Sequence, residues 1–370
     1  MNIIFEVKGG IGKHVAATAV CEGIKNRYPD ADLIVVSAYP EVFINNPNVK
    51  RSLGFGQLSY FYTQFIEGKE FLVFKHDPYD SNSYLHQQTH LIKCWFEQFG
   101  LIYNEEQPRI YLTQREIDFH QKKLPTDKPL LMLQTNGGAV DQPLKYSWAR
   151  DMPKNIAEAI IKQFSKEYHI LHIRRDDQPA YDNTIQVKDD FRAIAAMMLA
   201  TKKRVFIDSF AQHTAAALKL PSTVLWVANK PEVFGYDLHT NITAKEFNKE
   251  PELRNSYLNR FSIIGDPLEF PYQSEDHIFN VDQVLKAIYD EGGELQSEMT
   301  YVEMFELSNK IDKQYFETKS DGSNNLNAQK VMEGLKEQSE IAPMNTGLNN
   351  VPTDMKCTGE HNYSLGENSL

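Results

Sequence analysis

Cysteine is scarce in this chain, with only three among its 370 residues. Cys21, Cys94 and Cys357 lie far apart and match no spacing that is typical of a metal site or a redox pair. This excludes a disulfide framework of the kind that stabilises small secreted domains. We expect free thiols in a reducing compartment, so the protein is predicted to be cytoplasmic.

The sequence also lacks a long apolar run and an excess of basic residues. No segment approaches the roughly 20 apolar residues of a membrane span, and the start, MNIIFEVKGG, lacks the basic region of a signal peptide. The formal net charge of -11 argues against nucleic acid as a partner, because such binding depends on clustered Lys and Arg. We expect no transmembrane segment, while peripheral contact with a membrane stays open.

Apolar periodicity is present from the first residues and predicts an α/β fold. Asn2–Val7 and Leu33–Val36 have the composition of buried strands, and His14–Arg27 repeats apolar residues at helical spacing. A strand, a helix and a strand within about 30 residues predict a parallel pair joined by a right-handed crossover.

A break near Leu124–Pro129 separates two regions of this kind. From Leu130 strands and helices alternate again, which predicts a second doubly wound sheet. Beyond residue 310 apolar positions become rare, as is typical of disordered segments. We therefore predict an N-terminal Rossmann-like acceptor domain at 1–125, a C-terminal Rossmann-like donor domain at 126–295 and a disordered tail at 310–370.

A glycine-rich loop, Lys8–Lys13 with the sequence KGGIGK, follows the first predicted strand. It resembles the phosphate loop of ParA-like ATPases, but that motif continues with a Ser or Thr whose hydroxyl binds Mg²⁺. Here the next residue is His14. A ParA-like ATPase stays a minor alternative, because it would also need Mg²⁺-binding carboxylates on a neighbouring strand.

A second motif begins where the predicted strand Arg204–Ile207 ends. Asp208 follows the strand, and Ser209 is a residue that can cap the next helix. The free N–H groups and partial positive charge of a helix N-terminus bind phosphate groups. The motif therefore predicts a diphosphate-binding site.

This motif resembles glycosyltransferase family 9, the ADP-heptose:lipopolysaccharide heptosyltransferase group, whose element reads Asp-Ser-Gly-x-x-His-x-Ala-Ala-Ala before a Pro-Thr strand. The matching residues are Asp208, Ser209, His213, Ala215, Ala216, Ala217 and Pro221. The glycine of the element is Phe210 here. Lys145–Pro153 is similar to the family's Lys-x-Trp-Pro element, and Asn46–Val49 to its Asn-Pro-x-Val. The resemblance covers residues 1 to 290 and implies the GT-B fold, in which two Rossmann-like domains face a cleft.

By this resemblance the C-terminal domain binds a nucleotide-sugar donor. Lys145 would neutralise the donor phosphates, and Asp176 would hydrogen-bond the ribose from the end of a strand. The remaining donor contacts are predicted at Asp208, Ser209, Gln212 and His213.

The glycine loop is similar to that of another GT-B group, the MurG-like N-acetylglucosaminyltransferases. Their pattern Gly-Gly-x-Gly-Gly-His-Val fits Gly9–Val15 except at Lys13. In the heptosyltransferases this loop is followed by an aspartate that looks like the acceptor-activating base, and Lys13 stands at that place.

We predict that the loop binds the acceptor and that His14 accepts its proton, a role that suits a side chain with an ordinary pKa of about 6.5. Lys13 is included in the predicted catalytic pair because its charge favours neutral His14. The acceptor is predicted to approach along Gly9, Gly10 and Gly12. Two alternatives stay open: His14 only packs at the helix start, or an acid such as Asp77 or Asp80 is the base.

A metal site is not predicted. Several potential ligands follow one another without a typical ligand spacing: His76, Asp77, Asp80, His86 and His90. We expect no cofactor, since the nucleotide-diphosphate sugar is itself the donor substrate.

The predicted function is an inverting, metal-independent glycosyltransferase. It would move a sugar, with heptose as the candidate, from a nucleotide-diphosphate donor to a hydroxyl of a glycan or lipid-linked glycan such as lipopolysaccharide. Lys13 and Phe210 also motivate a non-catalytic GT-B protein that binds a glycan or nucleotide. Transfer onto a DNA base is disfavoured by the acidic charge.

Overall fold

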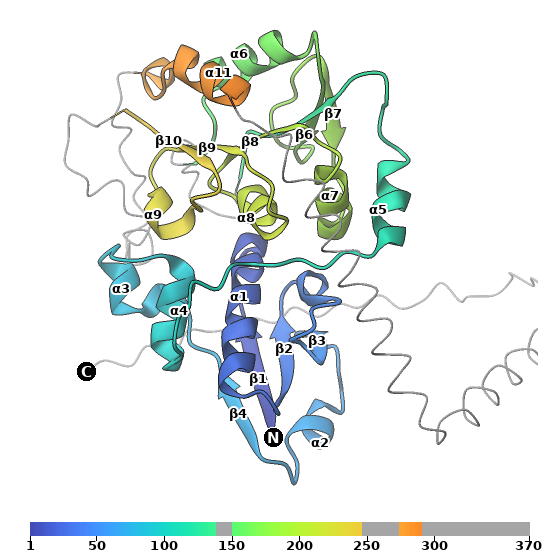
Figure 1. Ribbon diagram of the computed structural model, residues 1–370, viewed down its shortest axis with the longest axis vertical. Coiled ribbons are helices and arrows are strands. Elements are labelled where there is room, and N and C mark those ends of the chain that lie inside the picture. The colour runs from blue at the N-terminus through green and yellow to red at the C-terminus, as the bar shows by residue number, and fades with distance from the viewer. Residues whose placement is uncertain (138–149, 246–273, 291–370) are drawn as a thin grey trace, which may run out of the picture. The chain divides into compact units, whose positions relative to one another are not determined.

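The computed structural model describes residues 1–137, 150–245 and 274–290, which are drawn in colour in Figure 1. Both sheets described below belong to one compact unit, Met1–Ile311. Lys145 and the predicted disordered tail at 310–370 lie outside the described residues. Among the helices in the described ranges, none is both long and apolar enough to cross a membrane.

The first sheet has four parallel strands in the order β3-β2-β1-β4. The strands are β1 (Asn2–Val7), β2 (Asp32–Ser37), β3 (Arg51–Gly54) and β4 (Phe71–Phe74). Helix α1 (Ile11–Arg27) connects β1 to β2. It begins one turn earlier than its apolar periodicity suggests, because Gly10 takes the extended N-cap conformation directly after the loop.

Short helices follow the second, third and fourth strands and lead to the second sheet. They are η1 (Pro40–Phe43), α2 (Phe61–Phe65), η2 (Pro78–Asp80), α3 (Asn82–Leu85), α4 (Leu91–Phe99) and α5 (Gln114–Gln121). Helix α4 ends at Gly100, whose φ of 62° is the left-handed conformation that suits glycine at a helix end. Helix α5 begins with a capping box between Thr113 and Glu116.

The second sheet has six parallel strands in the order β10-β9-β8-β5-β6-β7. The strands are β5 (Leu130–Gln134), β6 (His169–Ile173), β7 (Thr184–Val187), β8 (Lys203–Ile207), β9 (Thr223–Trp226) and β10 (Thr240–Thr243). The helices are α6 (Lys154–Phe164), α7 (Phe191–Met198), α8 (Phe210–Ala217), α9 (Pro231–Phe234), η5 (Glu275–His277) and α11 (Val281–Asp290).

Both sheets share one strand order when their strands are numbered along the chain. The first strand of each lies between the second and the fourth, and the third lies beyond the second. In such doubly wound sheets ligands bind where the order reverses, at the carboxyl ends of the first and fourth strands. These switch points are the ends of β1 and β4 in the first sheet and of β5 and β8 in the second. The predicted α/β, doubly wound architecture is confirmed.

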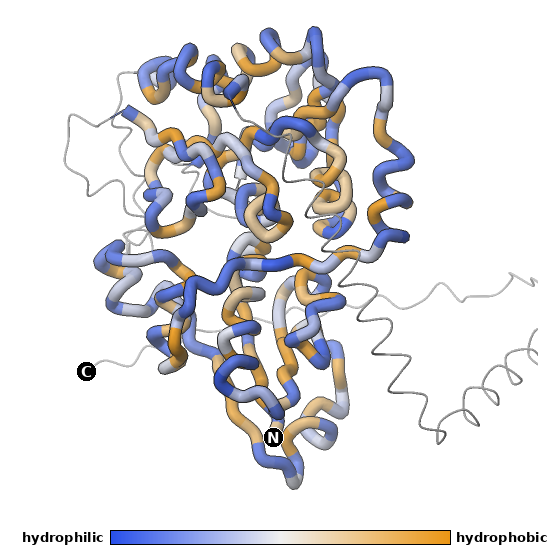
Figure 2. The backbone as a smooth tube through the Cα atoms, in the orientation of Figure 1, coloured by the Kyte–Doolittle hydropathy of each residue, from blue (hydrophilic) through white to orange (hydrophobic). Residues whose placement is uncertain are grey.

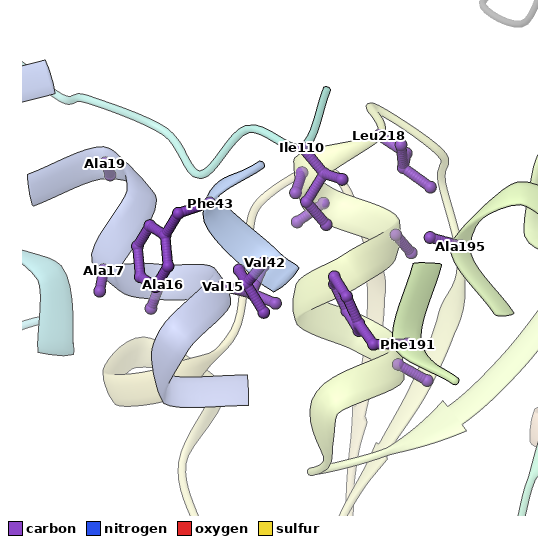
Figure 3. Packing of buried hydrophobic residues seen from close by; sticks show 14 of the residues in the cluster. Val15, Ala16, Ala17, Ala19, Val42, Phe43, Ile110, Phe191, Ala195 and Leu218 are labelled. Atoms are coloured by element: carbon purple, nitrogen blue, oxygen red, sulfur yellow. The ribbon is translucent and has the colours of Figure 1, made fainter. Parts of the chain in front are cut away.

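The two sheets share an apolar core, which passes from α1 and η1 to α7 and α8 (Figure 3). Val15 of α1 and Phe43 of η1 belong to the same buried cluster as Phe191 of α7 and Leu218 after α8. Figure 2 shows that β1 and β2 are largely hydrophobic, whereas the connection from α4 toward α5 is more hydrophilic. The shared cluster fixes the first region against the second.

The two regions approach each other closely at Gly12, in the first turn of α1. A Cβ atom at this position would lie 2.7 Å from Cδ2 of His213 and 3.2 Å from Cα of Phe210, both in α8. Only a residue without a side chain fits there without a shift. The N-terminal ends of α1 and α8 therefore meet.

Candidate functional site

The glycine loop turns sharply after β1. Gly9 has a φ of 94°, a conformation that residues with a Cβ atom rarely adopt. A Cβ atom there would also lie 3.3 Å from Cδ of Lys13. The loop therefore folds back over the aliphatic part of the Lys13 side chain.

His14 is fully buried between this loop and the helix. Its Nδ1 lies 2.9 Å from the carbonyl oxygen of Gly10, and its Nε2 lies 3.1 Å from that of Val7. Burial lowers the pKa of His14, the two carbonyl contacts raise it and the Lys13 charge lowers it, with a net decrease. Both ring nitrogens thus face the main chain, which gives the ring a structural role. Proton transfer by His14 stays a prediction.

Lys13 points toward the end of β4 and forms an ion pair with Asp77. Its Nζ lies 2.6 Å from Oδ2 of Asp77, and only 6% of its side chain is exposed. The ammonium also lies 4.6 Å from the ring centroid of Tyr79 and 5.8 Å from that of Trp95. Asp77 comes three residues after β4, so the pair spans the switch point of the first sheet.

Asp208 occupies the corresponding position in the second sheet, directly after β8. It is buried, and Asn229 after β9 donates a hydrogen bond from Nδ2 to its Oδ2. Burial raises the pKa of Asp208, against the opposing effects of the Arg150 charge and the Asn229 hydrogen bond. A carboxyl group with a raised pKa can also act as a hydrogen-bond donor.

Ser209 stands at the N-cap position of α8, but it does not cap the helix with its hydroxyl, as the sequence suggests. The hydroxyl accepts a hydrogen bond of 3.1 Å from Nε2 of Gln134 at the end of β5. A Cβ atom at Gly137 would lie 3.3 Å from Oγ of Ser209, so the loop after β5 passes close to the start of α8. The N-terminus of α8 therefore lies at the switch point without a side-chain cap from Ser209.

Gln212 and His213, predicted to bind the donor, are buried in α8. Nε2 of Gln212 donates a hydrogen bond of 3.0 Å to the carbonyl of Phe234, and Nδ1 of His213 lies 2.9 Å from the Tyr236 hydroxyl. Burial, together with the nearby His90 and His239, lowers the pKa of His213 to about 3. These contacts place His213 in the packing between α8 and α1, and its donor contact stays a prediction.

Asp176 follows β6 and is exposed. It accepts a hydrogen bond of 3.0 Å from Nε2 of Gln186 and pairs with Lys188. Hydrogen bonds and charge from Lys188 lower the pKa of Asp176. The ribose contact of Asp176 is untested and stays a prediction.

Asp151 was not among the predicted site residues, although it lies in the run Lys145–Pro153 that resembles a family 9 element. The carboxylate accepts hydrogen bonds of 3.0 Å from the Gly137 N–H and 2.8 Å from Nδ2 of Asn136, and burial raises its pKa. Asp151 therefore fixes the loop after β5. Its neighbour Arg150 is exposed, and its charge acts on both Asp151 and Asp208.

Tyr79 lies two residues after Asp77, in η2. Burial and the neighbouring Tyr84 raise the pKa of its hydroxyl. Its ring centroid lies 6.4 Å from that of Phe234 in α9. The segment after β4 therefore packs on the second region, and the start of α1 meets the start of α8 at Gly12. These contacts bring the two switch points together as a single candidate site.

Within residues 1–137, 150–245 and 274–290, no group of three or more His, Cys, Asp or Glu side chains could hold a metal ion. Nδ1 of His90 accepts a hydrogen bond of 3.3 Å from the Ile92 N–H, and burial lowers the pKa of His90 to about 4. Independence from metal ions stays a prediction.

Comparisons with known proteins agree on the fold. No protein-family model matches the chain, and no curated protein matches its sequence. The structure is similar to a glycosyl transferase family 9 protein from Veillonella parvula, with a TM-score of 0.55 and 13% identity over 77% of this chain and 95% of that one. It is also similar to ADP-heptose lipopolysaccharide heptosyltransferase II of E. coli, with a TM-score of 0.50 and 13% identity over 70% of this chain and 98% of that one. These similarities confirm the GT-B type fold and the fold-level resemblance to family 9.

Proposed function

We propose that this protein is a glycosyltransferase, which moves a sugar from a nucleotide-diphosphate donor to an acceptor hydroxyl. The observation that carries the proposal is the meeting of the two switch points, where the first turn of α1 at Gly12 lies against Phe210 and His213 of α8. Transfer between two substrates requires one binding region for each, placed so that the reacting atoms meet. The shared fold with glycosyltransferases supports this class of reaction.

The donor would bind at the ends of β5 and β8. The N-terminus of α8 offers N–H groups and a partial positive charge to the diphosphate, and Arg150 supplies a full positive charge nearby. Asp208, directly after β8, would contact the donor beside this helix start. Lys145, Asp176 and Ser209 remain further proposed donor contacts.

The acceptor would bind at the glycine loop. Its hydroxyl oxygen attacks the anomeric carbon as the bond from that carbon to the diphosphate breaks, and the electron pair leaves with the phosphate oxygen. A single displacement of this kind inverts the configuration at the anomeric carbon. We propose heptose as the sugar and a glycan or lipid-linked glycan as the acceptor, with neither a cofactor nor a metal ion and in the cytoplasm.

The second candidate function is binding without transfer. Lys13 stands where the heptosyltransferases have an aspartate, and Phe210 adds a side chain where they have glycine. A protein of this kind would bind a nucleotide sugar and leave it intact.

A thermal-shift panel separates these functions. The panel contains ADP-heptose, UDP-glucose, UDP-N-acetylglucosamine, GDP-mannose and ATP with Mg²⁺. A ligand at 100 times its Kd stabilises the native state by about 2.7 kcal/mol. We expect one nucleotide sugar to raise the Tm and then to release its nucleoside diphosphate.

The other outcomes decide between the alternatives. A shift without release, with either water or glycan acceptors, would indicate a binding protein. A response to ATP alone, with Mg²⁺-dependent turnover, would indicate an ATPase. No shift with any nucleotide sugar would refute the proposed function.

A further inference from the structure

Asp77 is placed where an acceptor hydroxyl would arrive. It follows β4, next to β1 in the sheet, so it lies at the same switch point as the glycine loop. Its side chain is 26% exposed, whereas His14 is 0% exposed and directs both ring nitrogens at main-chain carbonyls. Of these two groups, the carboxylate is the one that a substrate can reach.

Two donors hold the carboxylate in place. The Lys13 ammonium lies 2.6 Å from Oδ2, and the Tyr79 N–H donates a hydrogen bond of 3.0 Å to Oδ1. An ionised carboxylate has about four lone-pair sites. Both oxygens therefore retain capacity to accept a further hydrogen bond from a substrate.

Lys13 is itself confined by its surroundings. Its side chain is 6% exposed and its ammonium lies near the rings of Tyr79 and Trp95. A buried charge of this kind requires a partner, and Asp77 supplies it. Lys13 therefore holds a carboxylate that is 64 residues away in the sequence at the switch point of the first sheet.

We propose that Asp77 accepts the proton of the acceptor hydroxyl and that Lys13 is the positioning residue that orients Asp77. The inference rests on the proposed function. The hydroxyl proton moves to a carboxylate oxygen of Asp77 as the hydroxyl oxygen bonds to the anomeric carbon and the diphosphate leaves with the bonding electron pair. Lys13 takes no proton in this step, since it holds the carboxylate at the switch point.

The first test compares Asp77→Asn with Asp80→Asn in the full chain. Asp80, an exposed acid at the end of η2, is the other candidate base that the sequence leaves open, so this variant tests the rival directly. The assay measures nucleoside diphosphate release from the nucleotide sugar of the panel with the largest thermal shift, with water as acceptor. Loss of a general base lowers a rate by about 10²–10⁴-fold. We expect a loss of at least about a hundredfold for Asp77→Asn with the thermal shift retained, and a rate within threefold of wild type for Asp80→Asn.

Asp77→Asn leaves the Lys13 ammonium without its carboxylate and can destabilise the fold. The double variant Lys13→Met with Asp77→Asn removes both charges and keeps similar side-chain volumes. We expect it to fold, to bind the nucleotide sugar and to remain as slow as Asp77→Asn. This variant tests the carboxylate even when the single variant does not fold.

Lys13→Met and Lys13→Arg test the positioning role through the split between kcat and KM. The Lys13 ammonium is one of the two donors that hold the Asp77 carboxylate, so Lys13→Met is expected to lower kcat while the KM for the nucleotide sugar stays close to that of wild type. Lys13→Arg keeps the charge and is expected to restore most of kcat. A purely structural role would lower the Tm and leave the kcat of the folded protein unchanged.

The outcomes distinguish the two proposals. Release by wild type together with a rate within threefold for Asp77→Asn overturns the inference and leaves the proposed function standing. A large loss in Asp80→Asn, or loss of nucleotide-sugar binding in Asp77→Asn, also overturns it. No binding of any nucleotide sugar by wild type refutes the proposed function and the inference with it.

Discussion

The two sheets place an acid at the same topological position and give it different surroundings. Asp77 follows the fourth strand of the first sheet and is paired with the Lys13 ammonium. Asp208 follows the fourth strand of the second sheet, is buried, and is paired with the neutral Asn229 amide. The first carboxyl group is partly exposed and held by a cation, whereas the second is buried and held by an amide, so the two are placed for different contacts with a substrate.

The first turns after the two central strands differ as well. After β1 the chain enters α1 within a few residues, and the loop is shaped by Gly9 and the carbonyl contacts of His14. After β5 the loop is held by Asp151 through Asn136 and Gly137. One strand order thus supports two loops that are stabilised by unrelated hydrogen bonds.

A fall in pH should lower the free energy of unfolding through His172 of β6, which is fully buried. Burial and the Arg174 charge lower the pKa of His172 from 6.5 to about 4. Between these pH values only the unfolded chain binds a proton at His172, so stability is complete above pH 6.5 and falls as the pH drops toward 4. At about 1.36 kcal/mol per pKa unit, this loss is about 3 kcal/mol for His172 alone, and other buried histidines add to it.

The check is urea unfolding of wild type, His172→Gln and His277→Gln across this pH range. His277 is exposed and serves as the control. We expect a flatter dependence of the free energy of unfolding on pH for His172→Gln only. An equal dependence of the free energy of unfolding on pH in all three proteins would show that His172 does not cause the loss of stability.

Arg192 of α7 ties the second region to the first. It pairs with Glu116 of α5 at 2.6 Å and donates hydrogen bonds to the carbonyls of Glu41 and Tyr111. Burial raises the pKa of Glu116, but the bonds from Arg192 and Thr113 outweigh it and lower the pKa to about 2. Loss of one partner of a buried pair costs about 3 kcal/mol, which we expect for Arg192→Met in urea unfolding.

The exposed pair Lys50–Asp32 provides the matched control for this experiment. Its side chains are 59% and 46% exposed, so Lys50→Met is expected to change the free energy of unfolding by less than about 1 kcal/mol. If Arg192→Met and Lys50→Met lower the free energy of unfolding equally, the Arg192 contacts do not stabilise the association of the two regions.

Asp208→Ala should weaken donor binding while the protein stays folded. Hydrogen bonds to charged groups contribute about 1.5–3 kcal/mol, which corresponds to a loss of affinity of about 10-fold or more. Isothermal titration with the best nucleotide sugar measures this, with Asp77→Asn as the variant that keeps its affinity. Unchanged affinity in Asp208→Ala would remove the donor from the end of β8.

Gly12→Ala should change the free energy of unfolding least, because a packing cost and a gain in helix propensity oppose each other. The added methyl group meets His213 at 2.7 Å and the backbone of Phe210 at 3.2 Å, and overpacking of this kind costs about 1–3 kcal/mol. Alanine regains about 1 kcal/mol through its helix propensity. We expect a net loss of about 1 kcal/mol in thermal unfolding.

Gly10→Ala is the spatial control, since a Cβ atom at Gly10 meets nothing within 4 Å. A larger loss for Gly10→Ala than for Gly12→Ala would show that the contact between α1 and α8 is not tight.

Local signals in the sequence predicted the fold and singled out the two loops that the structure places at the switch points. Apolar periodicity and glycine placement act over a few residues, so Asn2–Val7, the glycine loop and the strand before Asp208 could all be recognised. The start of α1 was placed too late, because the predicted helix began at His14 while Gly10 caps it.

Contacts between distant residues could not be predicted in this way. Lys13 pairs with Asp77, which is 64 residues away in the sequence. The Ser209 hydroxyl accepts a hydrogen bond from Gln134, 75 residues away, and does not cap its own helix. Neither partner carries a local pattern that marks it. The sequence therefore identified the loops of the site and left the pairing of its side chains to the structure.

The contact between Gly12 and His213 also has a consequence for how the chain is made. The first sheet is complete by Phe74, but α8, which packs on α1, ends at Ala217, about 140 residues later. At synthesis rates of about 5–20 residues per second, these residues take roughly 7–30 s to make. During this time the apolar face around Val15 and Ala16 is without its final partner, so we expect the nascent chain to depend on chaperones over this interval.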